Sequence, residues 1–229
     1  MSRNAYYPVF VDLEGRRCLI IGGGLVAERK VTTLLKYGAA ITVVSPTLTR
    51  RLSRYVRQRK IWHVARPFRA NDLHGAWLVY AATDDQRINE LVSRAASRRR
   101  VFANIVDEPR LCSFIAPAQV KQGDLVIAIS TGGGSPALAK RIRQELQHLL
   151  GPHYGRMLRL LEQLRPQVQR RLKTPTNRKR FFEQLLNGSV FRFVQQGRFQ
   201  QARRSAMSLL VRAAKAGPRR TDGQTDRRT

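Results

Sequence analysis

The stretch CLIIGGGLVAERK, residues 18–30, decides the fold class. Its first four residues, Cys18 to Ile21, are apolar without polar alternation, which is typical of a buried strand. Gly22, Gly24 and Ala27 then fit the pattern G-x-G-x-x-A. In a strand–turn–helix unit the first glycine permits the tight turn. The second lets the backbone approach a pyrophosphate, and the small third residue lets the helix pack closely on the strand.

The sequence after this stretch supplies the rest of a β-α-β unit. A helix with a regular apolar face is predicted to about Tyr37, where Gly38 ends it, and Ile41–Val44 has the composition of a second parallel strand. The N-terminus of such a helix presents free N–H groups and a partial positive charge to phosphates. The unit therefore predicts a dinucleotide site. The alternative is a glycine-rich turn without a ligand.

The end of the second predicted strand lacks the acidic residue that commonly holds the ribose hydroxyls of NAD. Ser45, Pro46 and Thr47 stand there instead, and the first arginines after this strand are Arg50 and Arg51. From these residues alone, the choice between NAD and NADP stays open.

The bulk composition fits a globular protein with ample length for a core, at 229 residues and 42% hydrophobic residues. No apolar run approaches the roughly 18 residues of a membrane helix, and the N-terminus shows no signal peptide. Cys18 and Cys112 lie far apart and are expected to be buried free thiols in a reducing cytoplasm. The four histidines are scattered along the chain and the two cysteines are not closely spaced, so no metal site is expected.

The net charge of +28 is the most unusual number. Such an excess is typical of proteins with polyanionic partners, either nucleic acid or an acidic small molecule. The chain uses 35 Arg and 8 Lys, however, so an arginine-rich genome is an alternative cause. The basic residues are also dispersed, and no nucleic-acid-binding motif accompanies them. Nucleic acid is therefore not the expected partner.

Along the chain, alternating strands and helices to about residue 110 predict an α/β fold with a Rossmann-like, doubly wound parallel sheet. Residues 114–120 and 124–130 are predicted to form an antiparallel pair around Lys121–Gly123, and a helix capped by Ser135 follows, with an apolar stripe. Helices alone are predicted from 153 to about 215. We expect a dinucleotide-binding domain over 1–112, a small α+β dimerisation region over 113–150, a helical domain over 151–216 and a disordered tail over 217–229.

Polar residues follow the later predicted strands. In an open α/β sheet, ligands bind outside the carboxyl ends of the strands. Thr83, Asp84 and Asp85 follow one buried strand and either contact nucleotide hydroxyls or cap the next helix. Asp107 follows the last strand and is a candidate general acid or base, with a simple turn residue as the alternative. A second glycine turn precedes Pro136 and is either an anion site or a helix cap.

Five segments together resemble the siroheme synthase N-terminal family, which comprises the precorrin-2 dehydrogenases. They occur in the family's order and are GGGLVAERK (22–30), AATDD (81–85), ANIVDEP (103–109), SFIAPA (113–118) and GDLVIAISTGGGSPALA (123–139). The resemblance is close over about residues 6–150 and looser over the helical remainder.

The resemblance implies a homodimeric enzyme that oxidises precorrin-2, a tetrapyrrole with eight carboxylates, to sirohydrochlorin with NAD. Some members also insert Fe²⁺ as a substrate. The resemblance places the catalytic aspartate at Asp107. It implies cofactor contacts at Gly22, Gly24, Leu25, Val26, Ser45, Pro46 and Thr47, to which the strand-end argument adds Thr83 and Asp84. We expect substrate contacts in the second glycine turn, at Ser130, Thr131, Gly132 and Gly133. The methyltransferase domain of larger relatives is expected to be absent.

Two rival functions stay open at this stage. The first is a redox sensor that binds a dinucleotide without turnover, which leaves Asp107 and the second glycine turn without a role. The second is a nucleic-acid binder that uses the basic C-terminal third of the chain. A strongly salt-dependent affinity for duplex DNA is the mark of that binder.

Overall fold

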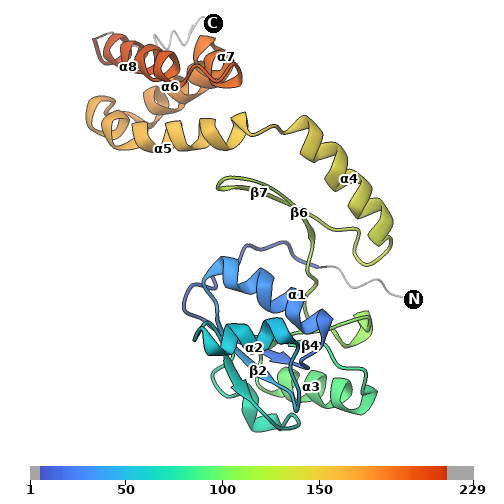
Figure 1. Ribbon diagram of the computed structural model, residues 1–229. Helices are drawn as coiled ribbons and strands as arrows, with labels where there is room; N and C mark the ends of the chain where they lie inside the picture. The colour runs from blue at the N-terminus through green and yellow to red at the C-terminus, as the bar shows by residue number, and fades with distance from the viewer. Residues whose placement is uncertain (1–5, 216–229) are drawn as a thin grey trace, which may run out of the picture. The chain divides into compact units, whose positions relative to one another are not determined.

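The structure is a computed structural model that describes residues 6–215 (Figure 1). The chain divides into two compact units. The first runs to Pro117 and includes Gly132–Gly134, and the second holds Ala118–Thr131 and the chain from Ser135 onward. Each unit has its own hydrophobic core, so each is described by itself.

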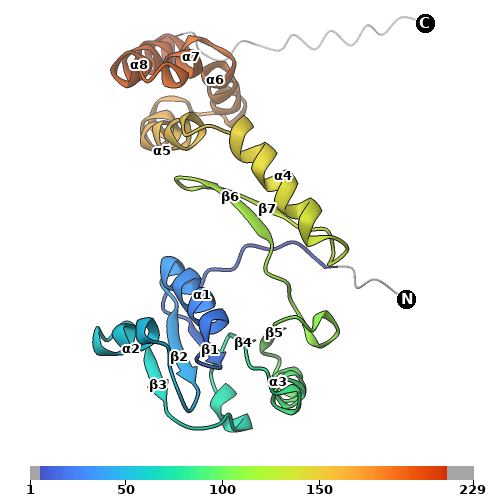
Figure 2. The ribbon, with the colours of Figure 1, turned by 45° about the vertical axis from the view of Figure 1, so that its right-hand side comes forward.

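The first unit is built on a parallel sheet of five strands in the order β3-β2-β1-β4-β5. Figure 2 shows these strands side by side. Order and direction are those of a doubly wound dinucleotide-binding sheet, which confirms the predicted fold class. The strands are β1 (Arg17–Ile21), β2 (Ala40–Val44), β3 (Trp62–Val64), β4 (Leu78–Ala81) and β5 (Phe102–Ile105).

Helices cover both faces of this sheet, because successive residues of each buried strand point to opposite faces and both sets are apolar. Cys18 and Ile20 pack with the helices α1 and α2, and Leu19 and Ile21 pack with α3 on the opposite face. The helices are α1 (Leu25–Leu34), α2 (Arg50–Arg57) and α3 (Gln86–Arg98), with short 3₁₀ turns η1 (Leu35–Tyr37), η2 (Ala70–Leu73) and η3 (Pro109–Leu111).

The second unit begins with the predicted antiparallel pair, β6 (Ala118–Gln122) and β7 (Leu125–Ile129). Its turn is shorter than predicted, because Lys121 and Gln122 belong to β6. Gly123, with a φ of +64°, makes the turn together with Asp124. The first strand also begins at Ala118 and not at Phe114, because Phe114 packs its ring on Tyr80 in the first unit.

The helix α4 (Pro136–Leu149) follows, with Ser135 as the predicted N-cap: its hydroxyl accepts a hydrogen bond from the N–H of Leu138 at 3.2 Å. The two ends of its apolar stripe are little covered by residues 6–215. Leu138 is 49% exposed and Leu149 is 71% exposed. The stripe is therefore available to something outside the single chain.

The rest of the second unit is a helical bundle, as predicted. Its helices are α5 (His153–Arg171), α6 (Pro175–Asn187), α7 (Ser189–Gln195) and α8 (Phe199–Lys215). The helices are separated near residue 174, at Gly188 and at Gly197. Phe181, Leu185 and Leu210 are among the side chains of its core. The tail predicted over 217–229 lies outside the described residues.

Candidate active site

Four loops that carry the predicted cofactor and catalytic residues meet at one edge of the sheet. Ile21 pairs with Val44 on one side and with Ala81 on the other, and Ala81 pairs with Ile105. The strands β1, β2, β4 and β5 therefore end level with one another. Residues up to 85 positions apart in the chain come to the same edge: Gly22–Val26, Ser45–Thr47, Thr83–Asp84 and Asp107.

Each glycine of the turn after β1 has a different physical reason. Gly22 has a φ of +108°, and a Cβ there would overlap the carbonyl oxygen of Ala82. A Cβ on Gly23 would overlap the carbonyl oxygen of Thr47. Gly24 has an ordinary φ of −83°, and a Cβ there would meet no atom within 4 Å. Gly22 and Gly23 are therefore glycines for the fold, and Gly24 leaves open space at the edge of the sheet.

The start of α1 is not capped by a side chain, whereas Thr49 caps α2 and Asp85 caps α3. Free N–H groups at a helix N-terminus carry a partial positive charge and bind phosphates. Leu25, the first residue of α1, is also 73% exposed. The open side of Gly24 and the uncapped start of α1 together fit the pyrophosphate of a dinucleotide.

Glu28 holds the start of α2 beside the turn, a role that sequence reasoning missed. The hydroxyl of Thr49 donates to Oε2 of Glu28 at 2.6 Å, and Nη1 of Arg51 lies 3.7 Å from the other oxygen. The N–H of Thr49 also donates to the carbonyl of Gly23 at 3.0 Å. The glycine turn and the loop after β2 are therefore fixed to one another.

The loop after β2 presents two of its three predicted cofactor residues to solvent. Ser45 is buried, and its carbonyl oxygen lies 2.9 Å from Nε2 of His63. Pro46 and Thr47 are exposed. A role for Ser45 at the ribose stays a prediction.

In the loop after β4, different residues fit the two predicted roles, which are capping of the next helix and contact with the nucleotide. Asp85 is the helix cap, because its Oδ1 accepts from the N–H groups of Arg87 and Ile88 at 2.9 and 3.2 Å. The hydroxyl of Thr83 accepts from the N–H of Asp85 at 2.9 Å and thus shapes the turn. Asp84 is exposed, and its carboxylate has no hydrogen bond to any residue within 6–215. Asp84 is therefore the member of this loop that is free for a ligand.

Asp107 occupies the turn after β5 with a φ of +63°. A left-handed conformation costs an L-residue roughly 1–2 kcal/mol, although Asp tolerates it better than most. Arg59 and Arg100 share it, but each follows the end of a helix, where it is common. The side chain of Asp107 is exposed. Asp107 is thus a turn residue, as one alternative held, and its exposed carboxylate lies at the same edge as the predicted cofactor residues.

The second glycine turn has a tight local structure. Gly132 and Gly133 have φ angles of +60° and +83°. The hydroxyl of Thr131 accepts from the N–H of Ser135 at 3.1 Å, so this side chain is used within the loop. Gly132 and Gly133 belong to the first compact unit, and Ser130 and Thr131 to the second. Contacts of these four residues with a substrate stay predictions.

Both cysteines are free thiols, as predicted, although Cys112 is only partly buried. Burial raises the pKa of the Cys18 thiol to about 11 and also raises that of Cys112. Over residues 6–215, no group of three or more His, Cys, Asp or Glu side chains is arranged to hold a metal ion. Within the same range, no helix has the length and apolar character needed to cross a membrane.

Three family models match successive parts of the chain. They are described as NAD(P)-binding (residues 9–118), sirohaem biosynthesis protein central (122–149) and sirohaem synthase dimerisation region (153–210). The chain belongs to the siroheme synthase N-terminal family. The region described as dimerising thus lies later in the chain than the 113–150 that we expected, and the domain bounds stay predictions.

Known members of the family are similar over most of the chain. It is 39% identical over 203 residues to the siroheme synthase of Methylobacillus flagellatus, covering 89% of this chain and 44% of that protein. Identity to the siroheme synthase of Salmonella typhi is 42% over 178 residues, or 78% of this chain and 39% of that one. The chain thus spans less than half the length of these relatives.

A solved structure is similar over most of the chain. The structure of SirC, a precorrin-2 dehydrogenase, aligns with a TM-score of 0.71 and 25% identity, and it covers 92% of this chain and 100% of its own.

Proposed function

We propose that the chain oxidises precorrin-2 to sirohydrochlorin with NAD as the hydride acceptor, in siroheme biosynthesis. One observation carries the proposal: an uncapped, glycine-led helix start and an exposed aspartate lie at the same edge of a doubly wound sheet. The similarity to a precorrin-2 dehydrogenase over 92% of the chain supports it.

In the dehydrogenation, some residues at this edge bind the cofactor and Asp107 accepts a proton. Bound NAD supplies the hydride acceptor. Gly24, Leu25 and Val26 bind its pyrophosphate through the open backbone at the start of α1. Thr47 and Asp84 are the first exposed polar residues after β2 and β4. Oxidation removes a hydride and a proton from the tetrapyrrole. Asp107 accepts the proton, because it is an exposed carboxylate with no hydrogen bond or ion pair within residues 6–215.

The proposal includes a homodimer. The α4 stripe, which we define as Leu138, Ile142, Leu146 and Leu149, is partly uncovered in the single chain, and a second copy is the occupant that the dimerisation-region match supports. The free thiols are consistent with the reducing cytoplasm that we expected.

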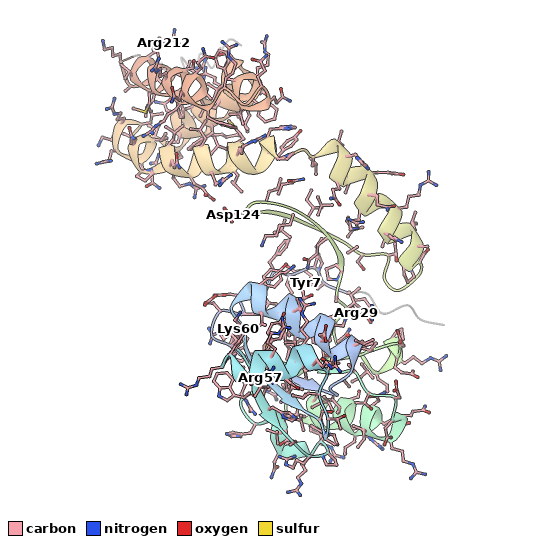
Figure 3. All side chains as sticks on the ribbon, in the orientation of Figure 1. Tyr7, Arg29, Arg57, Lys60, Asp124 and Arg212 are labelled. Atoms are coloured by element: carbon pink, nitrogen blue, oxygen red, sulfur yellow. The ribbon has the colours of Figure 1, made fainter. Side chains whose placement is uncertain are left out.

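The surplus of positive charge fits an octacarboxylate substrate, although salt limits the range of its attraction. In the helical bundle, basic side chains such as Arg212 stand on several sides and do not form a single stripe (Figure 3). A dispersed charge of this kind favours a general attraction of anions over a defined nucleic-acid surface.

The test is an anaerobic assay with enzymatically made precorrin-2, followed by absorbance. We expect sirohydrochlorin to form only when a nicotinamide cofactor is added, faster with NAD than with NADP. A parallel reaction with Fe²⁺ tests whether this chain also forms sirohaem faster than the uncatalysed reaction. Folded protein that binds NAD without converting precorrin-2 would support the redox sensor. Retention of duplex DNA at moderate salt would support the nucleic-acid binder.

A further inference from the structure

Lys30 differs from every other lysine of the chain. All eight lysines lie within the described residues, and Lys30 alone is partly buried, whereas the other seven are exposed. It lies on α1, and its ammonium group is 4.8 Å from the centre of the Tyr80 ring on β4. The sequence alone predicts no role for Lys30, because a lysine on a helix is ordinarily a solvated surface residue.

The surroundings of Lys30 are largely aromatic. Tyr80 on β4 and Phe102 and Asn104 on β5 share one face of the sheet, the face that carries α1. Phe114 folds back over this face: its ring lies 5.4 Å from that of Tyr80, and its carbonyl accepts from Nδ2 of Asn104 at 3.0 Å. Lys30 therefore covers the buried ring of Tyr80, on which the half-buried ring of Phe114 also packs.

Within residues 6–215, the ammonium group of Lys30 has no ion-pair partner. It also has no hydrogen bond to any described residue, and its one cation–π contact there is with the ring of Tyr80. Burial lowers the pKa of Lys30, the adjacent Arg29 adds to that effect, and Asp107 and Cys112 act in the opposite direction. A partly desolvated cation without a partner is costly unless an anion joins it.

We propose that Lys30 is a substrate-binding residue, whose ammonium group binds a carboxylate of the tetrapyrrole while the half-buried ring of Phe114 contacts apolar parts of the macrocycle. The inference rests on the proposed function. The rival anion is the cofactor's pyrophosphate. Lys30 is six residues beyond Gly24, about 9 Å along α1 from the predicted pyrophosphate site. It also interacts electrostatically with Asp107. These two facts favour the substrate.

The test compares Lys30→Met with Lys36→Met, which removes the same charge from an exposed lysine just after α1. Met keeps an unbranched stem on Tyr80, and Lys30→Gln is a second neutral variant in case the first is unstable. Lys30→Arg restores the charge. Dissociation constants for sirohydrochlorin and for NAD are measured by anaerobic titration, together with the KM and kcat for precorrin-2.

We expect both neutral Lys30 variants to weaken sirohydrochlorin binding and to raise the KM for precorrin-2 by about tenfold or more, as for loss of a charge-assisted contact. NAD binding should stay within about twofold of wild type, Lys30→Arg should restore most of the tetrapyrrole affinity, and Lys36→Met should match wild type.

Three results would overturn the inference. Neutral Lys30 variants that bind sirohydrochlorin like wild type would show that the ammonium group contacts no carboxylate. Weaker NAD binding with unchanged tetrapyrrole binding would assign Lys30 to the cofactor. If wild-type protein neither binds sirohydrochlorin nor oxidises precorrin-2, the proposed function itself fails and this inference fails with it.

Discussion

At the scale of single residues, adjacent glycines of the turn after β1 have separable roles. A methyl group on Gly23 collides with the backbone of the loop after β2, whereas one on Gly24 enters open space. The fold needs glycine at position 23, whereas only a bound cofactor needs glycine at position 24.

We predict that Gly24→Ala folds like wild type but binds NAD at least about tenfold more weakly, because the methyl group occupies the approach to the pyrophosphate. Gly23→Ala should instead lower the free energy of unfolding by about 1–3 kcal/mol, as overpacking does. Thermal unfolding and NAD titration of the two variants separate these effects. Unchanged NAD binding by Gly24→Ala would show that the pyrophosphate does not lie against Gly24.

Residue chemistry also predicts a pH dependence at Asp72. Its carboxylate accepts from Nη1 and Nη2 of Arg66 at 2.9 and 2.6 Å and from the N–H of Arg69 at 2.8 Å. Burial alone would raise the pKa of Asp72, but these hydrogen bonds outweigh it, and the pKa lies below the ordinary 3.8. A lowered carboxyl pKa contributes stability above the unfolded pKa, and that stability is lost as pH falls through the folded one.

We therefore predict that Asp72→Asn lowers the free energy of unfolding by about 1–3 kcal/mol at pH 7. The difference from wild type should shrink as the pH falls below 3.8, which denaturant titrations at several pH values measure. Glu90→Gln is the control, because the exposed pair of Glu90 with Arg94 is worth only about 0.5 kcal/mol. A difference that persists at low pH would contradict the ionic origin.

At the scale of elements, the start of α5 packs very closely on the hairpin of β6 and β7. A Cβ on Gly155, in the first turn of α5, would overlap the carbonyl oxygen of Gln122. Replacing glycine by alanine within a helix ordinarily gains up to about 1 kcal/mol. At Gly155, the overlap should reverse the sign.

We predict that Gly155→Ala lowers the free energy of unfolding of the second unit by about 1–3 kcal/mol. Denaturant unfolding followed by circular dichroism measures it, because this unit holds most of the helix. An increase in stability would mean that α5 does not approach the hairpin this closely.

Local signals in the sequence were enough for most elements. The β1–turn–α1 unit, the strand-end position of Asp107 and the caps of α4 could all be predicted, because each depends on residues close together in the chain. The requirement for glycine at position 23 depends on Thr47, and the partial burial of Lys30 depends on Tyr80 and Phe114. Such contacts join distant parts of the chain, so neither could be read from spacing. The hairpin was predicted, but its turn was placed two residues too early.

At the scale of the whole molecule, the α4 stripe predicts the oligomeric state. We expect Leu149→Glu to raise the dimer dissociation constant by about tenfold or more, because a charge would enter an apolar interface. Gln144→Glu, an exposed polar position on the same helix, should leave it unchanged. Light scattering across a dilution series measures both variants. A wild-type monomer at every concentration would contradict the proposed dimer.

In the proposed function, the whole molecule is an NAD-dependent dehydrogenase in which Asp107 takes the proton. Its most direct test is the anaerobic turnover number for precorrin-2 oxidation by wild type and by Asp107→Asn, which keeps the residue's shape and its tolerance of the left-handed conformation. We predict NAD-dependent turnover by wild type, and a loss of about 100-fold or more in kcat for a variant that melts like wild type. Equal turnover by the two proteins would contradict the role of Asp107, and no turnover by folded wild type would contradict the proposed dehydrogenase.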